Sequence, residues 1–258
     1  MKPQKKMILF FMVKAVLISV IILAASSSTA ADKSNLPSGN AQPAKKLLKI
    51  GHRGAAGLAP ENTLAAFRKA CELGVDAIEL DVYLAGDSTA VVHHDYTLNP
   101  EIARTADGEW LSRPGPAIKD LTLAQLKTYD VGRLKPNSRY AQRYPEQKPA
   151  DGERIPSLGE VMSLLEATCD PATQLWVEIK TNPEKPALTP APESVGDAVV
   201  QLMRDQDFDR RVRILSFDWR ALVHIQKIAP DIPTVYLSLV GRGLNNICLL
   251  YTSPSPRD

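Results

Sequence analysis

Residues 75–83 read VDAIELDVY, and this stretch decides the fold. Ile78 and Leu80 alternate with Glu79 and Asp81, which is the period of a β-strand that has one apolar face. Glu79 and Asp81 are two positions apart, so both side chains leave the same face of the strand. A lone buried carboxylate is costly. The stretch therefore predicts a buried strand that also contributes to a polar site.

Strand-like and helix-like segments alternate around this stretch. We expect further strands at residues 47–51, 90–93, 174–180, 212–217 and 234–239, and helices at residues 61–73, 157–167, 194–205 and 219–228. This alternation is typical of a parallel α/β sheet or barrel. Residues 99–156 break the pattern, because they are rich in Pro, Gly, Arg and Asp and predict only one short helix, around residues 122–127. We interpret them as a long insertion.

Composition narrows the class of protein. The chain has 258 residues, of which 44% are hydrophobic and 23% charged, enough apolar side chain for a sizeable core. The first 30 residues contain four lysines and no acid, so the remainder has a net charge of −2 and gives no electrostatic case for nucleic acid. Three cysteines, Cys71, Cys169 and Cys248, are too few for a disulfide framework, and we expect buried unpaired thiols.

The first 30 residues have the layout of a secretory signal peptide. Lys2, Lys5 and Lys6 precede an apolar run that ends in small residues at positions 26–31. The uninterrupted part of the run, residues 15–25, is too short to span ~30 Å of hydrocarbon, so we expect cleavage and no stable membrane anchor. Residues 31–46 are expected to form a flexible spacer. The protein would then be periplasmic or secreted.

Polar residues recur where the predicted strands end. His52, Arg53 and Gly54 follow the first strand, His93 and His94 follow the third, and Glu178 and Lys180 lie on the fourth. In an α/β barrel the carboxyl ends of the strands hold the active site. Three carboxylates converging there, those of Glu79, Asp81 and Glu178, would repel one another unless a cation lay between them. Oxygen ligands of this kind suit Ca²⁺, Mg²⁺ or Mn²⁺.

Two histidines and Arg53 supply the other groups that phosphoryl transfer needs. Two histidines can supply a general acid and a general base near neutral pH, and Arg53 offers a planar fork for a phosphate. His93 and His94 are neighbours and must point opposite ways, and we assign His94 to the site because His93 lies within the apolar run. Each residue taken alone also suits a structural role, as a hydrogen-bonded histidine or a salt-bridged arginine.

Taken together and in order, these motifs resemble the glycerophosphodiester phosphodiesterase family over about residues 48–239. The matching pieces are His52-Arg53-Gly54, Pro60-Glu61-Asn62-Thr63, Glu79-Leu80-Asp81-Val82, His94-Asp95, Leu121-Thr122-Leu123 with Leu126, Ile155-Pro156-Ser157-Leu158 and Glu178-Ile179-Lys180. The resemblance implies a TIM barrel with an insertion. It also implies an enzyme that hydrolyses small-molecule glycerophosphodiesters to glycerol 3-phosphate and an alcohol.

The resemblance further assigns roles to individual residues. Glu79, Asp81 and Glu178 would hold a divalent cation, Ca²⁺ or Mg²⁺. His52 and His94 would be the acid and base, Arg53 and Lys180 would bind the phosphate, and Glu61 would be a further polar contact. Two other functions stay open: a phospholipase D-like enzyme acting on intact lipids, and a phosphate-ester binding protein without turnover. The oligomeric state is not predicted.

The end of the chain departs from this pattern. About six of the eight strands of a TIM barrel are predicted, and residues 242–258 show neither helix nor strand periodicity. We expect a domain at residues 47–241, truncated and followed by a non-native tail, with the barrel therefore incomplete. An inactive fragment is the corresponding alternative.

Overall fold

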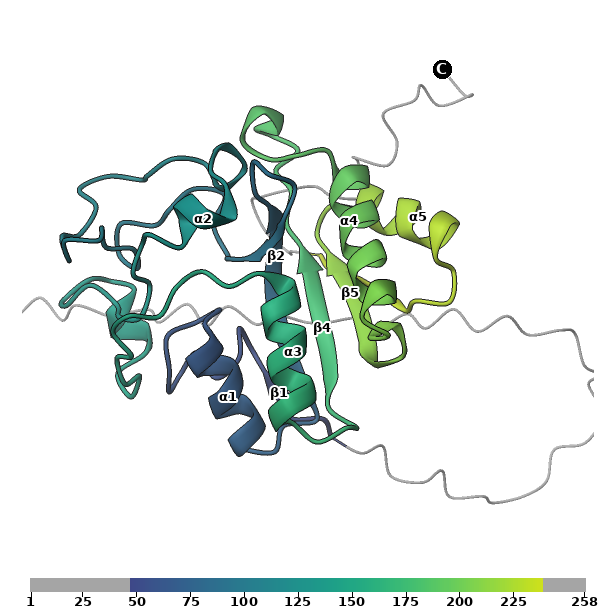
Figure 1. The fold of residues 1–258 in the computed structure, drawn as a ribbon, viewed down its shortest axis with the longest axis horizontal. Coiled ribbons are helices and arrows are strands. Elements are labelled where there is room, and N and C mark those ends of the chain that lie inside the picture. Colours follow the sequence, from purple (N-terminus) through teal and green to yellow (C-terminus); the bar gives the residue numbers. More distant parts are fainter. Residues whose placement is uncertain (1–46, 239–258) are drawn as a thin grey trace, which may run out of the picture.

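The computed structural model describes residues 47–238 (Figure 1). Within this range six strands form one sheet. The strands are β1 (Ile50–Gly51), β2 (Ala77–Leu84), β3 (Ala90–Val92), β4 (Gln174–Ile179), β5 (Val212–Ser216) and β6 (Thr234–Tyr236). Their order is β1-β2-β4-β5-β6, with all neighbours parallel, and β3 pairs only with β2. The sheet is α/β in type, as expected, and is not closed within the described range.

Helices follow or precede the parallel strands at the places where the sequence predicts them. They are α1 (Leu64–Glu72), α2 (Leu123–Leu126), α3 (Leu158–Thr168), α4 (Pro192–Asp205) and α5 (Trp219–Ile228). Side-chain caps fix the starts of α1, α2, α3 and α5: for example, Thr63 accepts from the amide of Ala66, and Ser157 closes a capping box with Glu160. Asp218 likewise caps α5, and the predicted bounds of that helix agree with the structure.

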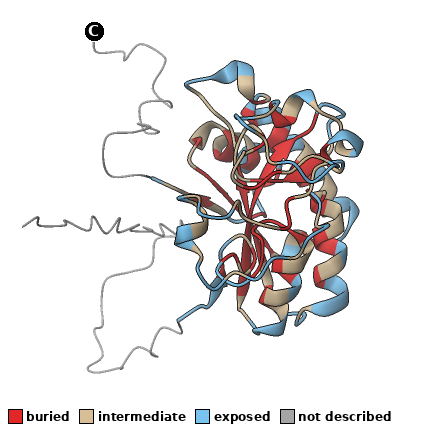
Figure 2. Ribbon diagram, turned by 90° about the vertical axis from the view of Figure 1, so that its left-hand side faces the viewer, coloured by how far each residue is buried: buried red, intermediate tan, exposed pale blue. Residues whose placement is uncertain are grey.

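The two faces of the sheet have different roles. Ile78, Leu80 and Val82 of β2 pack with α1, α3, α4 and α5 in the main hydrophobic core, and Figure 2 shows the buried strands flanked by helices whose outer surfaces are exposed. On the opposite face a small apolar cluster contains Ala77, Trp176, Leu215 and Val235. The alternation in residues 75–83 therefore separates core side chains from the side chains of the other face, on which Glu79 and Asp81 lie.

One strand has a different direction from the prediction. We expected the segment at residues 90–93 to be another strand of the parallel series, but β3 is antiparallel to β2, with Val82 opposite Val92 and Leu84 opposite Ala90. Only a short turn, residues 85–89, separates the two strands, which allows a hairpin but not a crossover. The hairpin brings the chain back along β2, and the amide of His93 donates to the carbonyl of Asp81 at 3.0 Å.

The stretch from residue 99 to residue 156 is irregular, as predicted, and has a small core of its own. Buried residues of this second core come from both the insertion and the β2–β3 hairpin, among them Tyr83, Val91, Leu98, Ile118 and Leu126. The predicted short helix is α2, which Thr122 begins with a capping box to Gln125. The insertion therefore packs against the strands that supply the polar face of the sheet.

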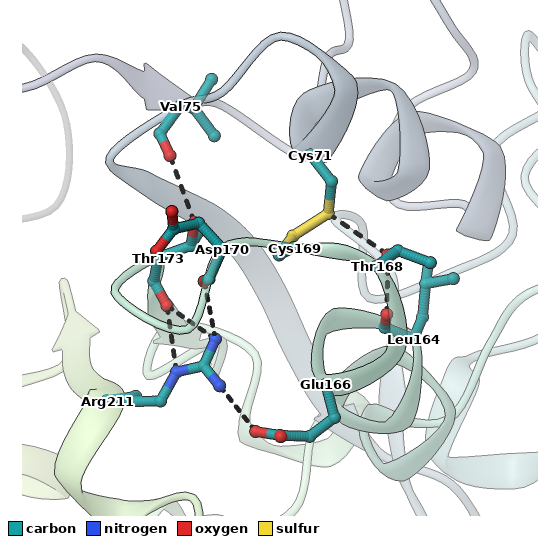
Figure 3. Close-up of a disulfide and its surroundings, with 9 residues drawn as sticks. All are labelled: Cys71, Val75, Leu164, Glu166, Thr168, Cys169, Asp170, Thr173 and Arg211. Carbon is teal, nitrogen blue, oxygen red and sulfur yellow. Dashed lines mark hydrogen bonds and ion pairs between the residues drawn. A yellow bond between two sulfur atoms is a disulfide. The ribbon is translucent and has the colours of Figure 1, made fainter.

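The prediction of unpaired thiols at Cys71 and Cys169 is wrong. These residues form a disulfide that joins the last turn of α1 to the end of α3 across 98 residues of sequence (Figure 3). The corner after α3 is also held by Arg211, whose guanidinium donates to the carbonyl of Thr173 and to Glu166. Periodicity placed both cysteines in helices, but it contained no information on how those helices pack together.

Several predictions concern residues outside the described range. These are the signal peptide at residues 1–30, the spacer at residues 31–46, the tail at residues 242–258, and Cys248. Within residues 47–238 no helix is long and apolar enough to cross a bilayer.

Candidate active site

Three buried carboxylates meet on the polar face of the sheet. Asp81 and Glu178 are directly opposite each other in the β2–β4 register, and Glu79 lies two positions before Asp81. One oxygen of each carboxylate lies within 4.8 Å of the others, and all three residues are at most 7% exposed. The arrangement follows from strand geometry, because side chains at even spacing on neighbouring parallel strands share a face. This cluster could bind a metal ion.

Lys180 supplies one positive charge to this cluster. Its ammonium lies 3.1 Å from Asp81 Oδ1 and 2.7 Å from Glu178 Oε1. Although burial alone would lower the pKa of Lys180, the carboxylates of Asp81 and Glu178 raise it, so the ammonium stays charged. Within residues 47–238, Glu178 Oε1 is paired with this ammonium but accepts no well-aligned hydrogen bond.

The formal charges of the ionised groups in the site do not balance. Four carboxylates, including that of Glu61, face two permanent cations, Arg53 and Lys180, which leaves a formal charge of −2. Burial raises the pKa of Glu79 well above its ordinary value, and the charges of Asp81 and Glu178 raise it further. The all-oxygen donor set and the uncompensated charge both fit a hard divalent cation such as Ca²⁺ or Mg²⁺.

Arg53 lies in the loop between β1 and α1 and is bound to this cluster at three points. Its backbone amide donates to Glu79 Oε2 at 2.9 Å, its Nη1 donates to Glu61 Oε1 at 2.9 Å, and its Nε lies 3.3 Å from Asp81 Oδ2. The loop is tight: Arg53 has φ 51°, and Gly54 has φ 80°. A Cβ on Gly54 would lie 2.8 Å from the backbone carbon of Ala66, so glycine is required there.

The four residues from Pro60 to Thr63 each have an identifiable contact. Thr63 caps α1 and donates its hydroxyl to the carbonyl of Pro60 at 2.6 Å. Asn62 has φ 54° and donates to Asp81 Oδ2 at 2.8 Å, while Glu61 binds Arg53. From the sequence we assigned Asn62 no functional role of its own, and the structure places it against the acidic cluster.

The two predicted histidines both lie near the carboxylates. His52 is 64% exposed at its side chain, and its Nε2 lies 3.8 Å from Glu79 Oε2. Desolvation by the surrounding protein lowers the pKa of His52, and the charge of Arg53 lowers it further. Burial opposes ionisation of Asp81, but the charge of Lys180, with a smaller contribution from nearby His94, lowers the Asp81 pKa. The structure therefore brings both histidines to the edge of the acidic cluster.

Asp95 holds His94 in one orientation. His94 Nδ1 and Asp95 Oδ1 are 2.7 Å apart, and Asn99 donates to the other carboxylate oxygen at 2.7 Å. Burial opposes ionisation of Asp95, but the hydrogen bonds with His94 and Asn99 and the nearby histidine charges together outweigh it and lower the Asp95 pKa. Because an ionised carboxylate only accepts hydrogen bonds, Nδ1 of His94 is the donor and Nε2 is left for other chemistry.

His93, the neighbour that we left out of the site, is buried. It is 5% exposed, and burial lowers its pKa. β3 ends at Val92, so His93 and His94 both lie just beyond the strand, where Asp95 binds His94.

Tyr140 is a site residue that the sequence did not reveal. It lies in the insertion, 87 positions after Arg53, and its hydroxyl accepts from Arg53 Nη1 at 2.8 Å. The same hydroxyl donates to Glu61 Oε2. No local pattern marks one tyrosine of an irregular segment as part of a distant site, so only the tertiary structure could identify it.

Comparison with known proteins places this geometry in a family. Residues 52–243 match the model of the glycerophosphoryl diester phosphodiesterase family. A curated glycerophosphodiester phosphodiesterase from Caldanaerobacter subterraneus is 37% identical over 187 residues, which cover 72% of this chain and 65% of that protein. The chain thus spans slightly less than two thirds of the length of this relative.

Solved structures agree with the fold. A Silicibacter pomeroyi protein described as a glycerophosphoryl diester phosphodiesterase aligns with a TM-score of 0.71 at 34% identity, over 78% of this chain and 68% of that one. An Oleispira antarctica phosphodiesterase, solved in complex with the product sn-glycerol-3-phosphate, aligns with a TM-score of 0.55 at 28% identity, over 78% of this chain and 70% of that one. The prediction of a TIM-barrel type of fold with about six strands is confirmed, with the sheet open over residues 47–238.

Proposed function

The chain belongs to the glycerophosphoryl diester phosphodiesterase family, and from this premise we propose that it hydrolyses glycerophosphodiesters to glycerol 3-phosphate and an alcohol. The observation that supports this most strongly is the convergence of three buried carboxylates with Arg53, Lys180 and two histidines at one edge of the sheet. That set contains the groups needed to bind a phosphate and to move protons at it.

We propose that Glu79, Asp81 and Glu178 hold a divalent cation, Ca²⁺ or Mg²⁺. Together with Glu61 these carboxylates exceed the formal charge of Arg53 and Lys180 by two, and within residues 47–238 Glu178 Oε1 lacks a well-aligned hydrogen bond. When bound, such an ion supplies positive charge that polarises the phosphodiester. Arg53 and Lys180 would contact the phosphate oxygens beside it, with the guanidinium acting as a planar fork.

The histidines would carry out the proton transfers. One removes a proton from the nucleophile, which is water or a neighbouring hydroxyl of the substrate. The other protonates the oxygen of the leaving alcohol as the phosphorus–oxygen bond breaks. The lowered pKa of His52 keeps its imidazole neutral at neutral pH, as a general base requires. Asp95 fixes the tautomer of His94 so that Nε2 is available to the reacting atoms.

One variant distinguishes this enzyme from a protein that only binds phosphate esters. His52→Ala should lower the rate of glycerol 3-phosphate release by about 10²–10⁴-fold. Binding of sn-glycerol 3-phosphate should change little, because Arg53 and Lys180 remain. His224→Ala is the matched control, since His224 lies on α5 and pairs with Asp197. A turnover equal to that of the wild type in His52→Ala would contradict the assigned role, and binding without turnover in the wild type would favour the binding protein.

We also propose that the protein is exported to the periplasm or secreted. The predicted signal peptide supports this, and the disulfide between Cys71 and Cys169 supports it independently, since such bonds persist in oxidising compartments. Fusion of residues 1–46 to a reporter that functions only after export tests the proposal. A reporter that stays inactive would contradict it.

A further inference from the structure

Arg53, Glu61 and Tyr140 form a closed ring of hydrogen bonds beside the acidic cluster. Arg53 Nη1 donates to Glu61 Oε1 at 2.9 Å and to the Tyr140 hydroxyl at 2.8 Å, and that hydroxyl in turn donates to Glu61 Oε2. Glu61 is 5% exposed, so removal of one partner leaves a buried charge with less compensation. Burial, followed by the charge of Glu61, raises the pKa of Tyr140, which keeps its proton available for donation.

The ring occupies one side of the guanidinium. Within residues 47–238, the side-chain hydrogen bonds and ion pairs of Arg53 involve Nη1 and Nε, with Nε 3.3 Å from Asp81 Oδ2. The remaining nitrogen, Nη2, is left for an incoming anion. A guanidinium is useful as a phosphate ligand only while its plane is held, because its donors have a fixed fork geometry.

The segment that contains Tyr140 is fastened to the loop that contains Arg53. Gln147 donates its side-chain amide to the carbonyl of Ala56 at 2.7 Å, and the backbone amide of Lys148 donates to the carbonyl of Leu58 at 2.9 Å. The Tyr144 ring lies 5.7 Å from the Tyr140 ring. The position of the Tyr140 hydroxyl is therefore set by the insertion as a folded unit.

We propose that Tyr140 is a positioning residue for phosphate binding, whose hydroxyl holds the Arg53–Glu61 pair so that the guanidinium faces the substrate phosphate. The proposal rests on the proposed function and adds a role for the insertion, which supplies this contact to the site. A ground-state contact of this kind affects substrate and product binding more than the chemical step.

Tyr140→Phe, compared with Tyr129→Phe, tests the proposal. Tyr129 is a half-buried tyrosine of the same insertion whose hydroxyl makes none of the hydrogen bonds found among residues 47–238, so it controls for loss of a phenolic oxygen. For Tyr140→Phe we expect the Kd of sn-glycerol 3-phosphate and the KM of glycerophosphocholine each to rise about 10-fold. We expect kcat to change by less than about 3-fold. Tyr129→Phe should match the wild type in all three.

A double-mutant cycle that combines Tyr140→Phe with Glu61→Gln provides a second test. If the hydroxyl acts through the ring, the loss in the double variant should be smaller than the product of the two single losses. Equal Kd and KM values for Tyr140→Phe and Tyr129→Phe, or independent effects of the two substitutions in the cycle, would overturn the inference and leave the proposed function standing. A wild-type chain that neither binds sn-glycerol 3-phosphate nor hydrolyses the diester would overturn both.

Discussion

Glu79 is the residue at which the electrostatics of the site are least balanced. It is buried near Asp81 and Glu178, while Lys180 pairs with those two carboxylates at 3.1 and 2.7 Å. Folding therefore raises the Glu79 pKa, first through burial and then through the neighbouring negative charges. A group of this kind stabilises the folded chain below its ordinary pKa, where it is protonated. That contribution is lost as the pH rises through the raised pKa.

The variant Glu79→Gln tests this account through stability. Without divalent metal at pH 7, its free energy of unfolding should exceed that of the wild type by roughly 1–3 kcal/mol, because a buried charge is removed. It should therefore unfold at a higher denaturant concentration. Added Ca²⁺ or Mg²⁺ should stabilise the wild type by about 2.7 kcal/mol at 100 times the Kd and should stabilise the variant far less. Glu72→Gln, at an exposed position of α1, is the control. Equal metal stabilisation of Glu79→Gln and wild type would rule out Glu79 as a ligand.

Sequence spacing predicted the residues that share a strand face but not those that approach from elsewhere. Glu79, Asp81 and Glu178 converge because strand periodicity and parallel pairing place them together. Asn62 reaches Asp81 from a position that sequence patterns assign equally well to a helix cap. Tyr140 reaches Arg53 through tertiary packing of an irregular segment, for which no periodicity exists.

At the scale of elements, the sequence again predicted features that are determined locally but not those that depend on how strands pair. Helices with strong caps, such as α3 and α5, begin within one residue of the predicted positions, because Ser157 and Asp218 satisfy their first amides locally. The direction of β3 could not be predicted from its three apolar residues, since alternation and burial look the same in a parallel and an antiparallel strand. Even so, His94 reaches the site, because the hairpin returns the chain to Asp81.

The disulfide between α1 and α3 should stabilise the folded chain, so we expect its loss to lower the melting temperature. It closes a loop with a sequence separation of 98 residues that contains β2, β3 and the insertion. Chain-entropy arguments give an upper value of about 4.7 kcal/mol for a loop of roughly this length, with 2–4 kcal/mol typical. We therefore expect the paired variant Cys71→Ser/Cys169→Ser to unfold roughly 5–15 °C below the wild type in thermal melts.

Cys248→Ser provides the matched control for that comparison and should have the same melting temperature as the wild type. Peptide mapping without reductant should recover residues 71 and 169 in one cross-linked fragment. Free thiols at both positions in protein purified from an oxidising compartment would contradict the pairing, as would an unchanged melting temperature in the paired variant.

At the scale of the whole molecule, an apolar layer of helices supports one face of the sheet while the opposite face holds the charged groups. The helices bury the alternate side chains Ile78, Leu80 and Val82, and the same alternation exposes Glu79 and Asp81 to the site. The insertion contributes Tyr140, so the site draws on strands β2 and β4, on the loops that follow β1, β3 and β4, and on the insertion. Dependence on a cation is therefore the prediction that connects the charge balance with the proposed chemistry.

The most direct test measures glycerol 3-phosphate release from glycerophosphocholine by the purified chain, with Ca²⁺ or Mg²⁺, after chelation, and after the metal is restored. The account predicts that release needs the cation, stops on chelation and returns when the ion is added back. Asp81→Asn should be inactive under all three conditions, because Asp81 joins the carboxylate cluster to both Arg53 and Lys180. Release that continues undiminished in chelator, or no release with either cation, would contradict the account.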